Sequence, residues 1–443
     1  MRAPLSIVVP ILVALSALAA CIAVHPEARM CKSEDTPTPA VRPLFYEDVE
    51  PIFAAKCGRC HNPAGSAPFS LRTYEEVWSH KELIRGAVAT KRMPPWPPAS
   101  CCGTFDAPLA LTDDELASVL GFLDQGTRPG RLGPDAGPSS PIGRHGLDRV
   151  DSVIETPDLY LPRPVEGDID ETRCFLLDWP EKEARYVTGI DIQPGVPGQM
   201  HHALALVVSA SDAEYLRERD EEDPGPGFRC PGGIVRFKDY LGGSFFQAQT
   251  YPPGLGHRID PGDKILLTMH YSPPKWAPGF TVDRTKLLLR HQREPTKPVV
   301  ALSVYDPAWL LGGMSIPKNE REVTFSYEDN PVLHNGNRPF LLHGVNLHMH
   351  ERGVRGQVAI LRDNGDRECL LQIDRFDHDW QGDYTFAAPV RLEKGDRLLV
   401  SCTFDNSEAN QRLRSGRREQ PRDLNWDEEE EMCVAFVSAT QVD

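Results

Sequence analysis

Basic residues are scarce in this sequence relative to acidic ones. The 443 residues include 48 lysines and arginines against 64 aspartates and glutamates, which gives a formal net charge of -16. No segment concentrates enough positive charge to neutralise the phosphates of a nucleic acid, so a nucleic-acid partner is excluded. Helical periodicity is also nearly absent after residue 146, apart from a brief segment at Asp212 to Glu221. A helical bundle is therefore excluded for that part of the chain.

Short alternating segments, separated by turn residues, take the place of helices after residue 146. Glycine and proline are plentiful, with 35 and 41 residues, and favour β-rich domains with many turns. The length indicates two to four domains. We predict two all-β, jelly-roll-like sandwiches, at residues 153–298 and 299–443. The expected strands include Arg173 to Leu177, Ala184 to Ile192, His202 to Val208, Lys264 to Tyr271, Lys286 to Arg290, Gln357 to Leu361 and Arg397 to Phe404.

The N-terminus predicts export. Met1-Arg2 precedes an apolar run from Leu5 to Ala20, which is typical of a secretory signal rather than of a membrane-spanning helix. The run ends in Leu18-Ala19-Ala20-Cys21, which resembles the bacterial lipobox, with residues 1–21 as the signal peptide and Cys21 as the lipidated residue. Cleavage of a plain signal peptide nearby is the alternative. We expect a lipoprotein anchored to the membrane in the periplasm or at the cell surface, with residues 22–43 as a flexible tether.

Export also permits disulfide bonds. Of the 11 cysteines, Cys21 is assigned to lipidation and two belong to the motif described next. The remaining candidates for bridges are Cys31, Cys101, Cys102, Cys174, Cys230, Cys369, Cys402 and Cys433. Cys101 and Cys102 are adjacent and too strained to pair comfortably with each other. The sequence leaves open whether one of them pairs with Cys31 or both are free.

A C-x-x-C-H motif follows the tether at Cys57, Cys60 and His61. It is the attachment signature of c-type haem, in which both thiols add to the haem vinyl groups and the histidine becomes the proximal iron ligand. A redox dithiol and half of a zinc site are the alternatives. A redox C-x-x-C does not need the histidine, however, and no second C-x-x-C follows at zinc-ribbon spacing. Haem attachment outside the cytoplasm also agrees with export.

Met93 is the expected second axial ligand of this haem. It lies in the proline-stiffened segment Lys91 to Trp96, and its soft sulfur would raise the haem potential. Core packing of Met93 is the alternative interpretation, and His80 is the competing ligand.

Helices are expected around these two segments. Tyr74 to Ala89 predicts a helix, and Thr112-Asp113-Asp114-Glu115 caps a second, amphipathic helix at Leu116 to Leu123. The order of helix, haem loop, helix, methionine loop and final helix resembles a small all-α cytochrome c domain at residues 44–131. A Gly/Pro-rich linker follows at residues 132–152.

Histidines form three features in the two expected sandwiches. His201-His202 follow Pro197-Gly198, and chelation by neighbouring residues of a strand requires a bulge or a strand start. His270 lies on the Lys264/Leu266/Thr268 face of an otherwise buried strand. His348 and His350 alternate with apolar residues, so both leave the same strand face and can chelate one metal ion. Taken separately, these features are also typical of polar strand ends and of satisfied core histidines.

Together with Met432, the three features resemble the copper type II, ascorbate-dependent monooxygenase family, which includes dopamine β-hydroxylase and peptidylglycine α-hydroxylating monooxygenase. The family pattern is a His-His pair and a lone His on the first sandwich, followed by H-x-H and a Met on the second. Glu430-Glu431-Met432-Cys433-Val434 looks like the dopamine β-hydroxylase version of the methionine motif, and Leu398 to Asn406 looks like its preceding strand. The resemblance covers about residues 155 to 440.

The resemblance implies two copper sites that face each other across a solvent-filled cleft. The first site consists of His201, His202 and His270, and the second consists of His348, His350 and Met432. The first copper stores an electron, and the second, whose thioether ligand favours Cu(I), binds O2 and hydroxylates a substrate C–H bond. The resemblance also implies a disulfide between Cys402 and Cys433, beside Met432, and one between Cys174 and Cys230 in the first sandwich.

The function expected from the sequence is an exported haem–copper monooxygenase that hydroxylates a small organic substrate. Electrons would reach the coppers from the haem domain, from ascorbate or another donor, or from both. Amidating family members place an Arg and a Tyr where this chain has Asn346 and Phe436, so a peptidylglycine substrate is not expected. A non-catalytic copper-binding or electron-transfer cytochrome at the cell surface is the alternative.

Overall fold

The computed structural model describes residues 42–62, 67–125, 129–130, 146–164, 170–230, 237–244, 248–272, 279–294, 296–411, 413–414, 417–427 and 430–442. The signal peptide and the lipidation site Cys21 fall on residues that lie outside this set, as do residues 22–41 of the expected tether and residues 132–145 of the expected linker. Strands make up most of the described elements. Within the described ranges, no helix is long and apolar enough to cross a bilayer.

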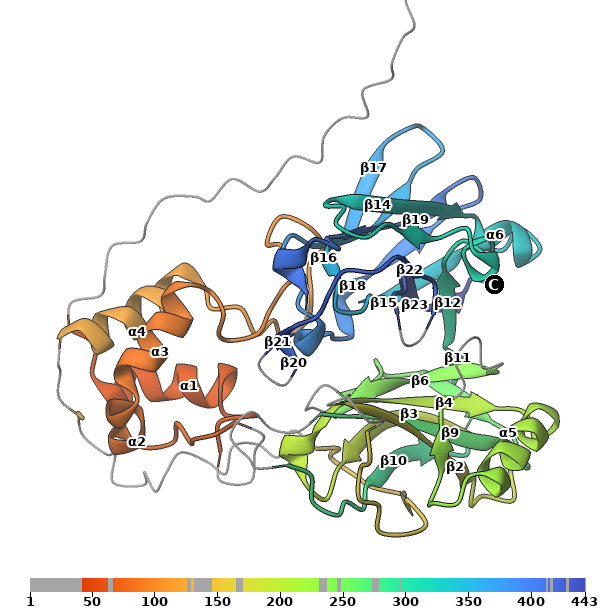
Figure 1. The fold of residues 1–443 in the computed structure, drawn as a ribbon, viewed down its shortest axis with the longest axis horizontal. Coiled ribbons are helices and arrows are strands. Elements are labelled where there is room, and N and C mark those ends of the chain that lie inside the picture. Colours follow the sequence, from red (N-terminus) through yellow and green to blue (C-terminus); the bar gives the residue numbers. More distant parts are fainter. Residues whose placement is uncertain are drawn as a thin grey trace, which may run out of the picture. The chain divides into compact units, whose positions relative to one another are not determined.

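Short helices form the N-terminal part of the described chain (Figure 1). They are α1 (Glu50–Lys56), α2 (Tyr74–Ser79), α3 (Lys81–Ala89) and α4 (Asp113–Gln125). Phe45, Phe53 and Phe122 are almost fully buried in the core that these helices share. A reciprocal capping box between Thr112 and Glu115 begins α4, because each side chain pairs with the backbone N–H of the other residue.

The helix expected over residues 74–89 is broken into two at His80. The backbone N–H of His80 donates to Val77 O rather than continuing the α-helical pattern, and φ and ψ at His80 are -115° and 14°. The imidazole Nδ1–H of His80 donates instead to the carbonyl oxygen of Glu76, at 2.9 Å. In a continuous α-helix, the backbone N–H of His80 would donate to this same carbonyl. The side-chain hydrogen bond therefore competes with the helix. The hydrophobic periodicity of the sequence does not reveal this competition, so it could not predict the break.

The first sandwich begins at Ser152 and packs two sheets on a core that includes Phe175, Leu267 and Met269. One sheet has the strand order β1-β10-β3-β8-β11, with β7 on β3, and the other has the order β5-β2-β9-β4-β6. The bounds are β1 (Ser152–Glu155), β2 (Glu171–Asp178), β3 (Arg185–Gln193), β4 (Met200–Val208), α5 (Ala210–Glu222), β5 (Phe228–Arg229), β6 (Asp239–Ser244), β7 (Gln249–Thr250), β8 (Leu255–Ile259), β9 (Lys264–Tyr271), β10 (Lys286–Gln292) and β11 (Lys297–Pro298).

The second sandwich packs the sheet β12-β23-β15-β18 against the sheet β14-β19-β16-β17. Leu347, Val400 and Phe404 are fully or almost fully buried in its core. The bounds are β12 (Val300–Val304), β13 (Ser315–Ile316), β14 (Val323–Asp329), α6 (Pro331–His334), β15 (Phe340–His348), β16 (Gly353–Leu361), β17 (Arg367–Ile373), β18 (Tyr384–Leu392), β19 (Arg397–Phe404), β20 (Leu413–Arg414), β21 (Arg417–Arg418), β22 (Leu424–Asn425) and β23 (Val434–Gln441).

The loop between α3 and α4 is attached to the second sandwich, which the sequence did not predict. Cys102 forms a disulfide with Cys369 on β17. Isolated β-bridges join Pro98 to Ile373 and Phe105 to Phe386 on either side of it. Residues 98–105 therefore behave as an added edge segment of this sandwich rather than as part of the helical core.

Disulfides also join Cys174 to Cys230 and Cys402 to Cys433, which are the two pairings that the family resemblance implies. Cys101, whose state the sequence left open, is disulfide-bonded as well.

Candidate metal centre and its surroundings

A β-bulge turns His201 and His202 toward a common point. Strand β4 pairs with β9, and the register shifts between Met200 and His202, so His201 is the extra residue of the bulge. The 3₁₀ turn Pro197–Gln199 ends directly before it. The sequence had required such a bulge if neighbouring histidines were to bind one ion, and the Pro-Gly dipeptide indicated where it would lie.

His270 completes a group of three imidazoles, here called the His201 cluster (His201, His202 and His270). It lies directly opposite His202 in the β4–β9 ladder. Nδ1 of His201 is 3.2 Å from Nδ1 of His202 and 3.3 Å from Nδ1 of His270. One ligand atom from each ring lies within 4.8 Å of those of the other two. Nitrogens that bind one ion at about 2.0 Å are about 3.3 Å apart at tetrahedral angles, so this spacing fits a metal ion.

A second group, here called the His348 cluster (His348, His350 and Met432), lies where β15 ends and β23 begins. His348 pairs with Val434 in this antiparallel ladder, and continuing the register places Met432 opposite His350. Nε2 of His348 is 3.1 Å from Nε2 of His350. Two lone pairs held this close repel each other unless a cation or a proton lies between them, so the pair also fits a metal ion.

Hydrogen bonds orient both rings of this second pair. Nδ1–H of His348 donates to Oε1 of the buried Gln381 at 2.7 Å, and Nδ1–H of His350 donates to the carbonyl of Glu430 at 3.3 Å. Because each Nδ1 is used as a donor, each Nε2 keeps its lone pair for a metal. Burial lowers the pKa of His348 to about 4, so its ring is neutral and able to bind metal near pH 7.

Glu431 holds the methionine segment against the histidine strand. Its side chain is fully buried and accepts hydrogen bonds from the backbone N–H groups of His350 and Arg352. The disulfide between Cys402 and Cys433 fixes the same segment from its other side. Met432 is thus enclosed between two anchored residues, and it faces the cavity that His348 and His350 line.

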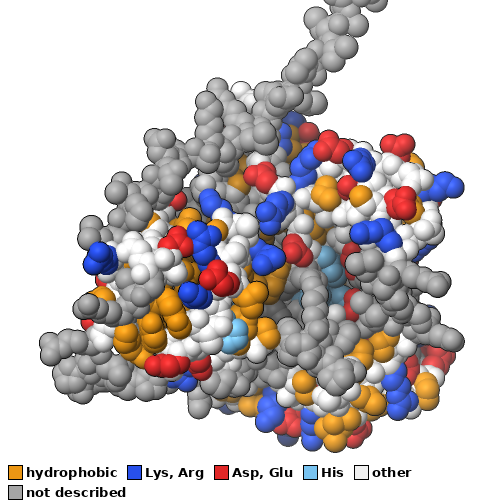
Figure 2. All heavy atoms as spheres, turned by 60° about the vertical axis from the view of Figure 1, so that its left-hand side comes forward, with side chains coloured by type: hydrophobic (Ala, Val, Ile, Leu, Met, Phe, Trp, Pro, Cys, Tyr) orange, Lys and Arg blue, Asp and Glu red, His pale blue; other side chains and the backbone are white. Residues whose placement is uncertain are grey.

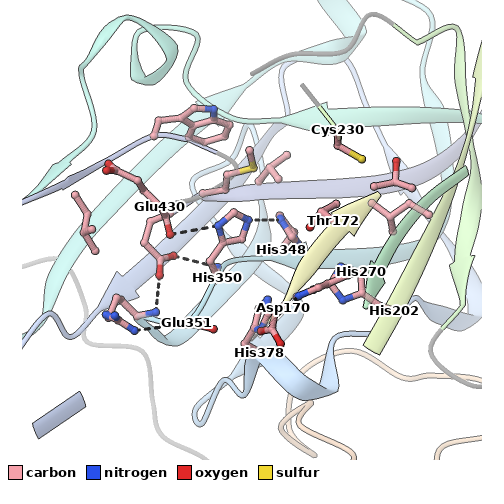
Figure 3. A pocket seen from close by; sticks show the side chains of 18 of the residues that line it. Asp170, Thr172, His202, Cys230, His270, His348, His350, Glu351, His378 and Glu430 are labelled. Carbon is pink, nitrogen blue, oxygen red and sulfur yellow. Dashed lines mark hydrogen bonds and ion pairs between the residues drawn. The ribbon is translucent and has the colours of Figure 1, made fainter. Parts of the chain in front are cut away.

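Every member of the two clusters except His201 lines one cavity of about 1030 Å³, here called the histidine cavity, although the clusters come from different sandwiches. The face drawn in Figure 2 is hollowed, and histidine side chains are exposed in the hollow. Figure 3 shows His348 and His350 on one side of the cavity and His202 and His270 on the other. His378 lies near both pairs, with its ring centroid 5.0 Å from that of His201 and 6.2 Å from that of His350. No sequence pattern marked His378, because it is a lone histidine in the loop between β17 and β18.

The comparisons with known proteins bear on the second of these sandwiches. Residues 310–439 match the family model of the copper type II ascorbate-dependent monooxygenase, C-terminal domain. The match includes the whole His348 cluster. No curated protein matches the chain.

Similarity to solved structures is weak. The major capsid protein P2 of bacteriophage PM2 aligns over 66% of this chain and 98% of its own, with 8% identity and a TM-score of 0.25. A peptide-N(4)-(N-acetyl-β-D-glucosaminyl) asparagine amidase aligns over 66% and 96%, with 11% identity and a TM-score of 0.28. These scores are too low to support an inference.

Two positions at which the sequence differs from the amidating members of the family it resembles have internal partners. Asn346 is buried, and its amide donates to the carbonyl of Gly382 at 3.1 Å. The Phe436 ring stacks on Tyr240 of the first sandwich, with the ring centroids 5.5 Å apart. Asn346 thus serves the packing beneath the cavity, whereas Phe436 is one of the cavity's lining residues.

The C-x-x-C-H residues and Met93 line a different cavity of about 660 Å³, here called the thiol cavity. Cys57 and Cys60 form no disulfide bond, and burial raises the pKa of Cys57 to about 12. Nδ1–H of His61 donates to the carbonyl of Phe69 at 3.0 Å, which leaves Nε2 available as a ligand. His80 stacks on Phe69 with the ring centroids 4.0 Å apart, and its Nδ1 is engaged in the helix break.

Proposed function

We propose that this protein is an exported haem–copper monooxygenase that hydroxylates a C–H bond of a small organic substrate. One observation carries the proposal. Two imidazole clusters, contributed by different sandwiches, face a single cavity, and one of them lies beside a methionine in a domain that matches the copper monooxygenase family. In the overall reaction, one atom of O2 enters the C–H bond, and the other leaves as water with two electrons and two protons.

The donor sets support copper in both clusters. The His201 cluster offers three imidazole nitrogens, which suit a copper that cycles between Cu(I) and Cu(II). The His348 cluster adds a soft thioether, which favours Cu(I). Bound copper would supply the activation of O2 and the storage of one electron. The residues around it orient the ligands, through Gln381 and Glu431, and exclude bulk water from the buried side of each ring.

A covalently bound haem c in the thiol cavity is the second part of the proposal. The thiols of Cys57 and Cys60, which form no disulfide, would provide the attachment, and the oriented Nε2 of His61 would provide the proximal ligand. Met93 lines the cavity and is our candidate for the sixth ligand, whereas His80 is not among the lining residues. Bound haem would supply one electron at a time. The short helices that share the core around Phe45 and Phe53 lie in the part of the chain where we propose this domain.

The two cavities adjoin, which supports an electron relay between the haem and copper. His201 and Gln381 line the thiol cavity, while His202 and His348 line the histidine cavity. Nδ1 of His201 lies beside Nδ1 of His202, and Gln381 is hydrogen-bonded to His348. Each cluster is therefore linked to the thiol cavity through one residue, His201 for the first and Gln381 for the second. Ascorbate or another donor would reduce the haem or the coppers from solution.

Export of the chain to the periplasm or cell surface, with a lipid anchor at Cys21, remains part of the proposal. The disulfides of the two sandwiches support an oxidising compartment, because such bonds rarely persist in the cytosol.

Oxygen uptake with ascorbate and added copper tests the enzyme. We expect substrate-stimulated uptake by the native protein, and loss of that uptake with Met432→Ile, which keeps an apolar side chain but removes the sulfur. Met314→Ile is the matched control, because Met314 is a fully buried core methionine of the same sandwich. If the protein binds copper but no candidate substrate stimulates oxygen uptake, the proposed monooxygenase activity is contradicted. The protein would then be a copper-binding protein.

A further inference from the structure

One wall of the histidine cavity is formed by three neighbouring strands of the second sandwich. In the sheet β12-β23-β15-β18, His348 pairs with Val434. Continuing the β12 register beyond the pair Val304–Ala435 places Tyr305 opposite Val434 on the other side. Paired residues point to the same face of a sheet, and Tyr305, Val434 and His348 all line the cavity. The row spans two strand spacings, about 10 Å, which leaves room for a small ring compound beside His348.

Two large aromatic rings lie at the far end of this row. The centroids of Tyr305 and Trp426 are 5.6 Å apart, and Trp426 also lines the cavity. An isolated β-bridge joins Trp426 to Glu431, directly before the ligand Met432. Trp309 is 4% exposed and packs against Trp426 at 5.9 Å, so the indole of Trp426 is held in place from within the core.

Phe436 completes what is here called the aromatic wall (Tyr305, Trp426, Val434 and Phe436). It follows Val434 by two residues on β23, so both side chains point to the same face. Its ring stacks on Tyr240 of the first sandwich, and both rings line the cavity. Aromatic rings attract other flat rings by offset stacking and edge-to-face packing. The aromatic wall therefore favours a flat, apolar ligand.

The arginines of the second sandwich that line the cavity are paired with acidic side chains. Arg422 bonds to Glu430, and Arg352 pairs with Glu351 and Glu419. A charged substrate would have to separate one of these pairs, or bury its own charge against apolar rings without a partner. Both cost free energy, so the site favours an uncharged molecule.

We propose that the substrate hydroxylated beside the His348 cluster is an uncharged compound with a flat, apolar ring that packs against the aromatic wall. The inference rests on the proposed function, since it takes the His348 cluster as the site of hydroxylation. One atom of O2 enters a C–H bond of this compound. The other leaves as water, with two protons from solvent and two electrons from the haem or from an ascorbate-type donor.

Equilibrium dialysis of the full chain under argon tests the substrate class with ethylbenzene, phenylacetate and benzylamine, which share one ring but differ in charge. The measurement is made with and without copper, so that direct ligation of copper by the amine or the carboxylate is recognised. We expect ethylbenzene to bind at least about tenfold more tightly than either ion, because only the ions must bury a charge. This comparison needs no variant and therefore does not depend on the folding of one.

Two variants test the aromatic wall itself. Tyr305→Leu and Trp426→Leu each keep an apolar side chain but remove a flat ring, so each should weaken ethylbenzene binding about 3–10-fold. Tyr327→Leu is the matched control, because Tyr327 lies on β14 of the same sandwich and does not line the cavity. Equal ethylbenzene affinity in all three variants would overturn the inference.

Arg422→Gln tests the role of charge in the opposite direction. It removes the partner of Glu430, so benzylamine should bind more tightly while ethylbenzene binding stays the same. Arg355→Gln is the control, because Arg355 pairs with Glu322 away from the cavity. Unchanged benzylamine binding in Arg422→Gln would contradict the argument from paired charges.

The outcomes also separate this inference from the proposed function. Tighter binding of phenylacetate or benzylamine than of ethylbenzene by the native protein, or oxygen uptake stimulated only by these ions, would overturn the inference and leave the monooxygenase proposal standing. Selective, wall-dependent binding of ethylbenzene, with no hydroxylated product from any ring compound in the presence of copper, ascorbate and O2, would support the binding site and contradict the proposed function.

Discussion

Gln381 supports a sharp prediction, because its side chain joins the two parts of the site. It is 4% exposed, its Oε1 accepts Nδ1–H of His348 at 2.7 Å, and its Nε2 donates to the carbonyl of His378. Gln381→Met keeps the length of the side chain but removes both bonds. A buried donor left without a partner costs about 1–3 kcal/mol. Each 1.4 kcal/mol is about tenfold in affinity, so copper should bind the His348 cluster about 10–100-fold more weakly.

Competition with a colorimetric Cu(I) chelator measures this change, since the two copper sites titrate separately when their affinities differ. We expect the weakening in one phase only, and the same phase should disappear with Met432→Ile. Gln381→Glu retains an acceptor and should keep the affinity. Gln372→Met is the matched control on β17, where the amide bonds to Asp374. Native affinity in Gln381→Met, or weakening of the His201 cluster instead, would refute the reasoning.

Three further predictions concern the haem ligand, an interface carboxylate and the loop clamp. Met93→Ala should change the haem absorption spectrum and lower the midpoint potential in a redox titration, whereas His80→Ala should change neither; the reverse result would make His80 the ligand. Burial raises the pKa of Asp383 to about 6 from 3.8, so between these pH values the folded state binds a proton that the unfolded state does not. The wild type therefore loses up to about 3 kcal/mol of stability as the pH rises from 4 to 6. Asp383→Asn should therefore gain stability relative to wild type over that range in melting experiments, and parallel pH profiles for the two proteins would contradict the assignment. Removing the Cys102–Cys369 clamp with a double serine variant should reduce the stability to chemical unfolding by about 2–5 kcal/mol, and an unchanged midpoint would show that the bridges at Pro98 and Phe105 suffice.

Strands and ligand positions were the most predictable features. Strand β9 spans Lys264–Tyr271 and β19 spans Arg397–Phe404, both as expected, because a short apolar run bounded by turn residues is typical of a buried strand. The bulge at His201 was also predictable, since two neighbouring histidines can reach one ion only if the pleat is interrupted. The match of residues 310–439 to the copper monooxygenase C-terminal domain agrees with the order of the ligands.

Features that depend on distant contacts were not predictable. His378 lies in a loop with no periodic neighbours, and it joins the site only because two sandwiches meet there. Cys102 and Cys369 are 267 residues apart in the sequence, and no local pattern selects this pairing among the possible pairings of the cysteines. The break at His80 depends on one side-chain bond to Glu76 that competes with an otherwise favourable helix.

The central claim is that the thiol cavity and the histidine cavity belong to one redox chain. The most direct measurement starts from anaerobic protein with haem bound and both clusters loaded with Cu(II), and reduces the haem with one equivalent of electrons. We expect the reduced-haem absorption to decay while the Cu(II) EPR signal falls by the matching amount. A haem that stays reduced beside an undiminished Cu(II) signal would contradict the relay.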